Sequence, residues 1–339
     1  MPGVRRAAMR APEFWWTAEG GLPARLLEPA GLAYGWATAR RLARGRGRAV
    51  RLPVLVVCVG NLVAGGAGKT PVVADLTRRL RRDRGLDAVV LSRGHGGRAR
   101  GPLRVDPHGH DAATVGDEPL MLARDGLPVW IARDRAAGGR AAVAAGAGAV
   151  VMDDGFQNPA LVQDLSLVVV DGARGFGNGR LIPAGPLREP VPVGLGRAGA
   201  VVIMGRDTAR VARRVPAHVP TLGARLVPGP RVRRLAGQPV VAFAGIGDPD
   251  KVFRMLHDVG CRVLATHPFA DHHPYQGADI QPILDEAFAL GAAPVTTAKD
   301  AARLPPDQRQ QVDVIDVAVA WDDPAALARL LGRALAAAG

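Results

Sequence analysis

Residues 53–71, PVLVVCVGNLVAGGAGKTP, decide the fold of this chain. The apolar, mostly β-branched run at 54–59 predicts a buried parallel strand, and residues 72–80 predict a helix. A glycine-rich turn of this kind presents backbone N–H groups to the phosphates of a nucleotide, with a lysine on a phosphate and a hydroxyl on Mg²⁺. We therefore predict a phosphate loop formed by Val63, Ala64, Gly65, Gly66, Ala67, Gly68, Lys69 and Thr70.

This loop departs from the strict pattern G-x-x-x-x-G-K-[ST], which needs glycine at position 63. Gly60 stands three residues further out, so we interpret the stretch as a variant. The alternative is an ordinary glycine-rich strand–helix turn with an incidental lysine. The scarcity of lysine argues against that alternative: of 44 lysine and arginine residues, only Lys69, Lys251 and Lys299 are lysines. One of the three, Lys69, stands in the predicted loop, where a compact positive charge matches a phosphate.

The composition limits the classes of function. The 339 residues, 48% of them hydrophobic, suffice for two domains or for one large domain with an appendage. The net charge of +13 suits nucleic acid, an anionic membrane surface or an anionic substrate. The aromatic content of 4% argues against a base-stacking surface, so we expect no nucleic-acid partner. Two cysteines, Cys58 and Cys261, indicate neither a disulfide framework nor a metal site and fit a reducing cytoplasm.

The sequence predicts a chain that is neither membrane-spanning nor exported. No apolar run reaches about 18 residues, and the N-terminus lacks the apolar core of a signal peptide. Residues 1–52 are nevertheless unusual, because they hold three of the five tryptophans and a cluster of arginines between positions 40 and 51. Such an amphipathic basic segment can lie in a membrane surface. It can equally form a helix that packs on the protein with an exposed arginine edge, and both can hold.

The order of the elements predicts an α/β fold. Strand candidates alternate with helical or loop segments, which indicates a P-loop NTPase-like, mostly parallel sheet with helices on both faces. We divide the chain into an N-terminal basic helical segment (1–52), a P-loop nucleotide-binding domain (53–215), a hairpin-like β linker (216–237) and a smaller C-terminal α/β domain (238–339). The strand candidates of the first domain are residues 54–59, 88–91, 129–132, 149–152, 167–170 and 200–203.

Two acidic pairs follow or precede these elements. Asp153 and Asp154 come directly after a strand candidate, where an acidic residue beside a phosphate loop holds Mg²⁺. Asp117 and Glu118 precede a helix, and they can either favour its N-terminus or receive the proton of an alcohol during phosphoryl transfer. Asp-Asp-Gly on its own is also a common turn.

The predicted second domain contains Asp271, His272 and His273. A histidine is more often structural, and this set is weak as a metal site. A histidine that reached a carboxylate of the first domain would raise the basicity of that carboxylate and hold it in orientation. Two further stretches, residues 92–96 and 175–190, are glycine- or proline-dense loops of the kind that often carry function.

Taken together, these motifs resemble the tetraacyldisaccharide 4′-kinase (LpxK) family over nearly the whole chain. The matching segments are residues 60–71, 92–94, 116–119, 153–157, 177–179, 183–189 and 244–247. The match also includes Pro12, Phe14 and Trp15 near the start, and Phe269, Asp271, His272, Tyr275, Thr297, Lys299 and Asp300 in the predicted second domain. The combination is specific, although no single segment is.

The resemblance implies an ATP- and Mg²⁺-dependent kinase that phosphorylates the 4′-hydroxyl of tetraacyldisaccharide 1-phosphate in lipid A biosynthesis. It implies a cytoplasmic enzyme associated peripherally with the cytoplasmic face of the inner membrane through an N-terminal helix. It also implies two α/β domains joined by a short β linker.

The resemblance also implies roles for individual residues. Asp117 would take the hydroxyl proton with support from His272, and Lys69 would act on the phosphates. Thr70, Asp153 and Glu118 would organise Mg²⁺. The matching motifs add six candidate site residues without a specified role: Asn61, Arg93, Asp154, Gln157, Arg188 and Glu189. Three positions depart from the family pattern, so a direct role is doubtful for His95, Asn158 and Ala298.

Three other functions compete with this interpretation. A regulatory or partitioning ATPase often has a second lysine early in its phosphate loop, and none is present here. A metal-insertion GTPase needs an Asn/Thr-Lys-x-Asp contact to guanine, and the only remaining candidate, Ala298-Lys299-Asp300, lacks that spacing. A nucleic-acid binder is disfavoured by the low aromatic content and by the lack of a recognition module.

Overall fold

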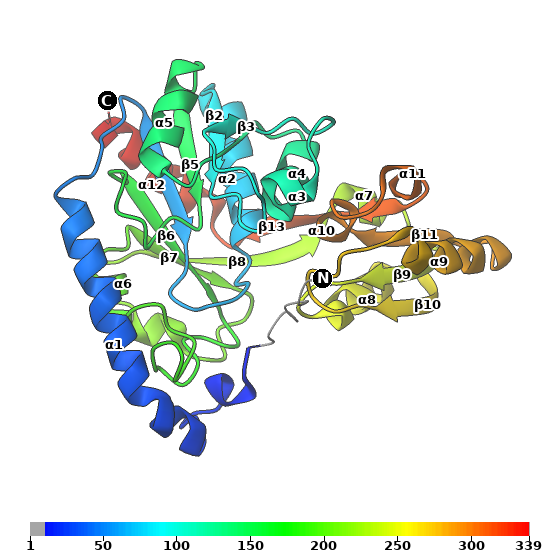
Figure 1. The fold of residues 1–339 in the computed structure, drawn as a ribbon, viewed down its shortest axis with the longest axis horizontal. Helices are drawn as coiled ribbons and strands as arrows, with labels where there is room; N and C mark the ends of the chain where they lie inside the picture. The colour runs from blue at the N-terminus through cyan, green and yellow to red at the C-terminus, as the bar shows by residue number, and fades with distance from the viewer. Residues whose placement is uncertain (1–10, 339) are drawn as a thin grey trace, which may run out of the picture.

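The computed structural model describes residues 11–338, which form two α/β domains, with a long helix along the first domain (Figure 1). The first domain is built on a nine-stranded sheet in the order β13-β8-β7-β6-β1-β5-β2-β4-β3. All its neighbours pair in parallel except β3 with β4 and β13 with β8. The strands are β1 (Leu55–Gly60), β2 (Ala88–Ser92), β3 (Leu103–Arg104), β4 (Val129–Ile131), β5 (Ala149–Asp153), β6 (Leu165–Asp171), β7 (Ala200–Met204), β8 (Thr221–Pro228) and β13 (Val317–Trp321).

This architecture confirms the predicted α/β class. Each of the six runs predicted as strands in the first domain forms one, within one or two residues at each end. The central strands β1, β5 and β7 are buried along their whole length, as expected for parallel strands covered on both faces. The helices of this domain are α2 (Lys69–Arg84), α3 (Ala112–Val115), α4 (Asp117–Arg124), α5 (Arg135–Ala144), α6 (Val191–Leu195) and α12 (Pro324–Ala338), with the 3₁₀ helix η2 (Val211–Arg214).

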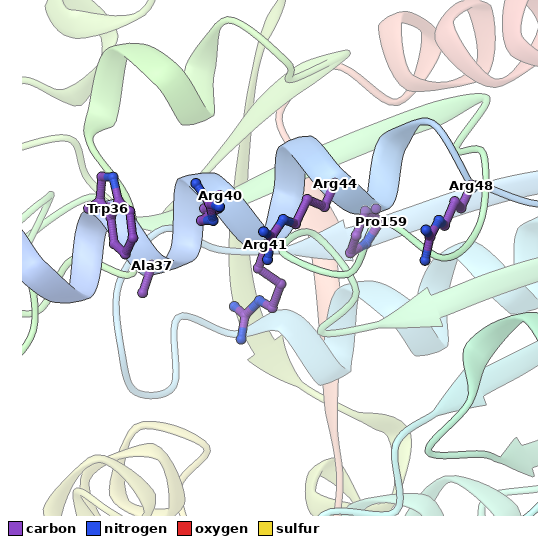
Figure 2. Close-up of a pocket in the computed structure, with 8 residues that line it drawn as sticks. Trp36, Ala37, Arg40, Arg41, Arg44, Arg48 and Pro159 are labelled. Atoms are coloured by element: carbon purple, nitrogen blue, oxygen red, sulfur yellow. The ribbon is translucent and has the colours of Figure 1, made fainter.

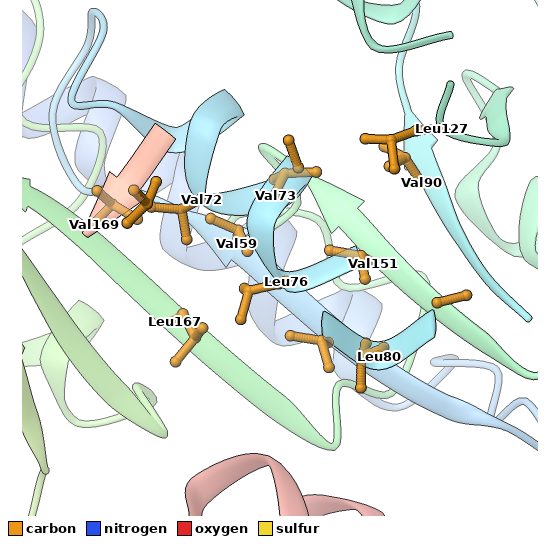
Figure 3. Packing of buried hydrophobic residues seen from close by; sticks show 14 of the residues in the cluster. Val59, Val72, Val73, Leu76, Leu80, Val90, Leu127, Val151, Leu167 and Val169 are labelled. Carbon is orange, nitrogen blue, oxygen red and sulfur yellow. The ribbon is translucent and has the colours of Figure 1, made fainter. Parts of the chain in front are cut away.

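Helix α2 anchors the phosphate loop to the core. Its buried stripe, which includes Val72, Leu76 and Leu80, packs on the side chains of Val59 and Leu167 from the sheet (Figure 3). Each such side chain contributes about 1.5–3 kcal/mol when fully buried. The start of α2 is therefore fixed at the carboxyl end of β1.

The second domain is a four-stranded parallel sheet in the order β10-β9-β11-β12. Val240 and Ala242 of its central strand β9 share one core with α8, while Val241 and Phe243 share another with α9 on the opposite face. Its elements are α7 (Pro230–Arg233), β9 (Pro239–Ala244), α8 (Pro249–Asp258), β10 (Arg262–Pro268), α9 (Gly277–Ala289), β11 (Ala293–Thr297), α10 (Ala298–Ala301), α11 (Pro306–Arg309) and β12 (Asp313–Ile315).

Two expectations about the connection between the domains were wrong. Residues 216–237 do not form a hairpin, because they contribute one strand, β8, whose antiparallel partner is β13 near the end of the chain. The chain therefore crosses between the domains twice, and β13 and α12 return to the first domain rather than completing the second. Leu327, Leu330 and Leu331 of α12 are buried in the same core as β1 and α2. An apolar helix face needs a partner surface, and this one lies on the larger sheet.

The N-terminal segment forms the 3₁₀ helix η1 (Glu13–Trp16) and the helix α1 (Gly21–Arg46), which runs along the outside of the first domain (Figure 1). The helix continues through Pro29. Its inner face is made largely of small residues, and at Gly31 an added Cβ would lie 3.0 Å from the carbonyl oxygen of Leu181. Glycine thus permits close packing between α1 and the loop at 175–190. The inner-face residues are Ala24, Gly31, Gly35, Thr38 and Leu42.

Candidate active site

The predicted phosphate loop connects β1 to α2. Gly65 and Gly68 have φ angles of +112° and +82°, a backbone region that favours glycine. Gly68 precedes the first helical residue, Lys69, and has no side chain to cap the helix. The N–H groups of the first turn are therefore available to an anion, and the helix dipole favours negative charge there.

Polar side chains beneath this loop hold its shape. Asn61 is fully buried, and its Nδ2 donates to the carbonyl oxygen of Gly65 at 3.1 Å. The ammonium of Lys69 donates to the same oxygen at 3.3 Å. Asn61 and Lys69 thus hold the same carbonyl oxygen from two positions of the chain.

Asp153 is the last residue of β5, directly beside Val59 of β1. It is only 3% exposed, and its Oδ1 has no hydrogen-bond partner among the described residues. Burial, together with the negative charges of Glu118 and Asp154, raises the pKa of this carboxyl to about 7. A buried carboxylate without a partner is costly, and a cation is the ligand that would remove this cost.

Asp154 differs sharply from its neighbour. Its backbone has a φ of +52°, and its carboxylate faces two cations, Arg188 at 2.7 Å and Lys69 at 3.7 Å. Burial acts to raise the pKa of Asp154, but the charges of Lys69 and Arg188 outweigh it and lower the pKa below its usual value. Asp154 therefore stays ionised and orients Lys69.

The loop at 175–190 and α6 close one side of this arrangement. Gln157 Nε2 donates to the carbonyl oxygen of Asn61 and to Oε1 of Glu189, both at 2.9 Å. Glu189 is 2% exposed and pairs with Arg197, whose guanidinium stacks over the ring of Phe156 with its Cζ 4.4 Å from the ring centroid. These contacts bring together Asn61, Asp154, Gln157, Arg188 and Glu189, all of which the sequence nominated.

The second half of the site spans the two domains. Asp117 is the first residue of α4, and its Oδ2 lies 2.9 Å from Nδ1 of His272, which follows β10 in the second domain. His272 has a φ of +58°, a left-handed conformation of the kind that concentrates at functional sites. Burial acts to raise the pKa of Asp117, but the hydrogen bond from His272 and the charges of Lys299 and Arg303 lower it below its usual value. The contact that the sequence could suggest but not demonstrate is therefore present. The expected rise in the basicity of the carboxylate was wrong, because an N–H donor and neighbouring cations favour its ionised form.

Glu118 and Arg93 lie at the margin of this region. Oε1 of Glu118 is 3.9 Å from Nζ of Lys299, and its charge acts on buried Asp153. Arg93 is exposed after β2 and acts electrostatically on the buried Arg135. Of the positions that depart from the family pattern, Asn158 has a local structural role, because its Oδ1 accepts from the backbone N–H of Ala160 at 3.0 Å.

Sequence reasoning assigned no role to four cationic residues around the site: Arg135, Arg197, Lys299 and Arg303. Arg135 is 2% exposed, and burial lowers its pKa to about 10, with Asp153 opposing that shift. Arg303 lies 4.0 Å from Asp117 and 2.6 Å from Asp300. The scarcity of lysine in the sequence could have marked Lys299 as a candidate site residue. Arginine is too frequent in this chain for its position to mark one.

The donor set suits Mg²⁺ better than a transition metal. Within residues 11–338 no cluster of three or more His, Cys, Asp and Glu side chains forms a metal cage. Thr70 follows Lys69 in the loop, Asp153 lies beside Val59 of β1, and the charge of Glu118 acts on Asp153. Their hydroxyl and carboxylate oxygens fit Mg²⁺, which is held in such sites by one or two carboxylates together with phosphate oxygens. The partnerless Oδ1 of Asp153 is consistent with this fit.

Comparison with known proteins gives one consistent result. A family model described as tetraacyldisaccharide-1-P 4′-kinase (LpxK) matches residues 23–336. The tetraacyldisaccharide 4′-kinase of Rhodospirillum rubrum is 60% identical over 329 residues, covering 96% of this chain and 98% of that protein. The corresponding protein of Rhodospirillum centenum is 57% identical over 331 residues, covering 96% of this chain and 97% of its own.

A solved structure is similar over the same extent. The crystal structure of LpxK from Aquifex aeolicus in complex with ATP matches with a TM-score of 0.76 and 26% identity, covering 92% of this chain and 99% of that one. Sequence, fold and site geometry therefore agree: this chain belongs to the tetraacyldisaccharide-1-P 4′-kinase family.

Proposed function

We propose that this protein transfers the γ-phosphate of ATP to the 4′-hydroxyl of tetraacyldisaccharide 1-phosphate in lipid A biosynthesis. The observation that carries the proposal is the hydrogen bond of 2.9 Å between Asp117 and His272, formed across the two domains near a phosphate loop. The name of the two relatives, tetraacyldisaccharide 4′-kinase, supplies the substrate. An ATPase that only hydrolyses ATP has no alcohol acceptor and therefore does not need such a pair to take a hydroxyl proton.

The nucleotide half of the site comprises the phosphate loop, Lys69 and Thr70. The open first turn of α2 and the ammonium of Lys69 would bind the phosphates of ATP. Thr70, Asp153 and Glu118 would hold Mg²⁺, which neutralises charge on the phosphates as the phosphoryl group is transferred. Asp154 would keep Lys69 in place, since it pairs with Lys69 and with Arg188.

The acceptor half comprises Asp117 and His272. Asp117 is ionised at neutral pH, because its pKa is lowered by its cationic neighbours despite its burial. Its carboxylate would accept the proton of the 4′-hydroxyl as the oxygen attacks the γ-phosphorus. His272 donates to Oδ2 and would hold that carboxylate in orientation.

The outer face of α1 supports association with a membrane surface. Leu22, Leu26, Leu32 and Trp36 are 65–72% exposed on this helix, an arrangement that suits insertion into the interface of a bilayer. Beside Trp36, a groove of about 590 Å³ is lined by Arg40, Arg41, Arg44 and Arg48 (Figure 2). Anionic head groups would neutralise these arginines. We place the protein peripherally at the cytoplasmic face of the inner membrane.

No helix within residues 11–338 has the length and apolar character needed to cross a membrane. The regulatory ATPase, the metal-insertion NTPase and the nucleic-acid binder are not favoured, because none of them needs an apolar outer helix face together with an interdomain carboxylate–histidine pair.

Radiolabelled phosphate transfer tests the proposed reaction. Purified protein with Mg²⁺ and γ-labelled ATP should label tetraacyldisaccharide 1-phosphate, and Lys69→Ala should abolish the labelling. Lys251→Ala is the matched control, because Lys251 pairs at the surface with Asp248 at 3.6 Å. This variant should retain full activity. Label on a different acceptor with none on the disaccharide would refute the substrate assignment.

A further inference from the structure

The imidazole of His272 has a second partner besides Asp117. Its Nε2 lies 3.2 Å from Nζ of Lys299, which belongs to the short helix α10. The carboxylate of Asp271 lies near the same nitrogen, but its distance of 3.9 Å is too long for a hydrogen bond. Lys299 itself also faces Asp271 at 3.7 Å and Glu118 at 3.9 Å. The Lys299 ammonium thus lies close to His272, Asp271 and Glu118 around the acceptor half of the site.

The two hydrogen-bond partners assign the tautomer of this histidine. An ionised carboxylate can only accept, so Nδ1 must carry the proton that faces Asp117. An ammonium can only donate, so Nε2 must offer its lone pair to Lys299. Only the neutral imidazole with its proton on Nδ1 satisfies both contacts.

A buried network fixes the positions of both Lys299 and His272. Asp300 is fully buried and accepts from the backbone N–H of Gly245 at 3.0 Å and from the hydroxyl of Tyr275 at 3.0 Å. The carbonyl oxygen of the same Gly245 accepts from the backbone N–H of His272 at 3.1 Å. Arg303 donates to Asp300 and to the Lys299 carbonyl oxygen. The hydrogen-bond network of the second domain therefore holds Nζ of Lys299 and Nε2 of His272 in contact.

We propose that Lys299 is a positioning residue for the Asp117–His272 pair: its ammonium donates to Nε2 of His272 and thereby keeps the imidazole proton on Nδ1, directed at Asp117. Without Lys299, Nε2 can take the proton instead. The imidazole then either loses its bond to Asp117 or faces it as a cation, which weakens Asp117 as a base. The catalytic consequence rests on the proposed function, but the tautomer does not.

Nitrogen NMR of the histidine side chains tests the tautomer directly. In protein labelled with ¹⁵N-histidine, the signals that disappear in His272→Gln identify this ring. We expect a protonated Nδ1 and an unprotonated Nε2 in the unaltered protein, and a shift of both signals in Lys299→Met. A protonated Nε2 in the unaltered protein would overturn the proposal, and so would signals that do not change in Lys299→Met.

Kinetics of the same variants test the catalytic consequence. Lys299→Met should lower kcat by about 10- to 100-fold, at or below the lower end of what general acid–base catalysis contributes, with KM for ATP changed by less than about two-fold. Lys299→Arg, which keeps a cationic donor, should recover part of the loss, and Lys251→Met should behave like the unaltered protein. A rise in KM for ATP with unchanged kcat would make Lys299 a nucleotide ligand and overturn the proposal. Failure of the unaltered protein to phosphorylate the lipid would refute the proposed function instead, and the NMR result would still decide the tautomer.

Discussion

Asp153 and Asp154 are adjacent in the chain, yet their pKa values shift in opposite directions. Within residues 11–338, Oδ1 of Asp153 has no hydrogen-bond partner, whereas Asp154 pairs with Lys69 and Arg188. Because successive residues point in different directions at the end of a strand, Asp154 can pair with Lys69 while the carboxylate of Asp153 would be left for the proposed Mg²⁺.

The raised pKa of Asp153 predicts a pH-dependent stability. The folded protein keeps this proton up to about pH 7, while the unfolded chain loses it near pH 4. The folded state therefore binds more protons between these values, and its stability falls as the pH rises through that window. Asp153→Asn should raise the free energy of unfolding of the metal-free protein by on the order of 1–4 kcal/mol at about pH 8, and by much less at about pH 4.5. Urea unfolding at both pH values measures this, and an equal effect at both would contradict the assignment.

Two glycines near the phosphate loop should respond differently to alanine. A Cβ at Gly60 would lie 2.4 Å from Cβ of Phe156, so Gly60→Ala forces β1 away from the loop after β5. We expect a loss of about 1–3 kcal/mol in unfolding free energy. A Cβ at Gly66 meets nothing within 4 Å, so Gly66→Ala should leave stability unchanged but weaken ATP binding, because the methyl group occupies space over the loop. Thermal unfolding and ATP titration separate the two, and similar stability losses would argue against this division.

At the scale of elements, α1 combines a tightly packed inner face with an apolar outer face. Leu22→Ser, Leu26→Ser and Trp36→Ser together should weaken binding to anionic vesicles by at least about ten-fold, since each exchange removes apolar area from the bilayer contact. The fold should be unaffected because these side chains are exposed. Co-sedimentation with vesicles and a thermal melt measure the two effects.

The matched control for α1 is Phe288→Ser, which removes a side chain that is 90% exposed in the second domain. This variant should bind vesicles as the unaltered protein does. Equal losses in the control and the triple variant would mean that general surface hydrophobicity, and not α1, carries the binding.

The sequence predicted most elements near the site, because parallel strands and a glycine loop have strong local patterns. It could not predict that β8 pairs with β13, since the two strands lie about ninety residues apart and short alternating runs do not specify a partner sheet. For the same reason the contact of Lys299 with His272 was out of reach, although both segments were part of the family resemblance. Motifs locate the loops that carry a site, but the distances between side chains depend on how two domains pack.

At the scale of the whole molecule, the C-terminal residues belong to the first domain. Trp321 of β13 donates from Nε1 to Asp75 of α2 at 2.7 Å, and α12 covers the core beneath. A chain that ends after Asp316 should therefore lose the stability of the nucleotide-binding domain rather than that of the second domain. Aggregation or a strongly lowered Tm is the expected result, whereas a folded protein that still binds ATP would contradict this account of the core.

The central claim is that one site is assembled from a nucleotide half and an acceptor half on two domains. Steady-state kinetics of Asp117→Asn, with ATP and tetraacyldisaccharide 1-phosphate as substrates, tests it most directly. We predict that kcat falls by at least about 100-fold while KM for ATP stays within about two-fold, because Asp117 acts on the acceptor hydroxyl and not on the nucleotide. A variant that keeps its kcat, or one whose only change is a raised KM for ATP, would contradict the claim.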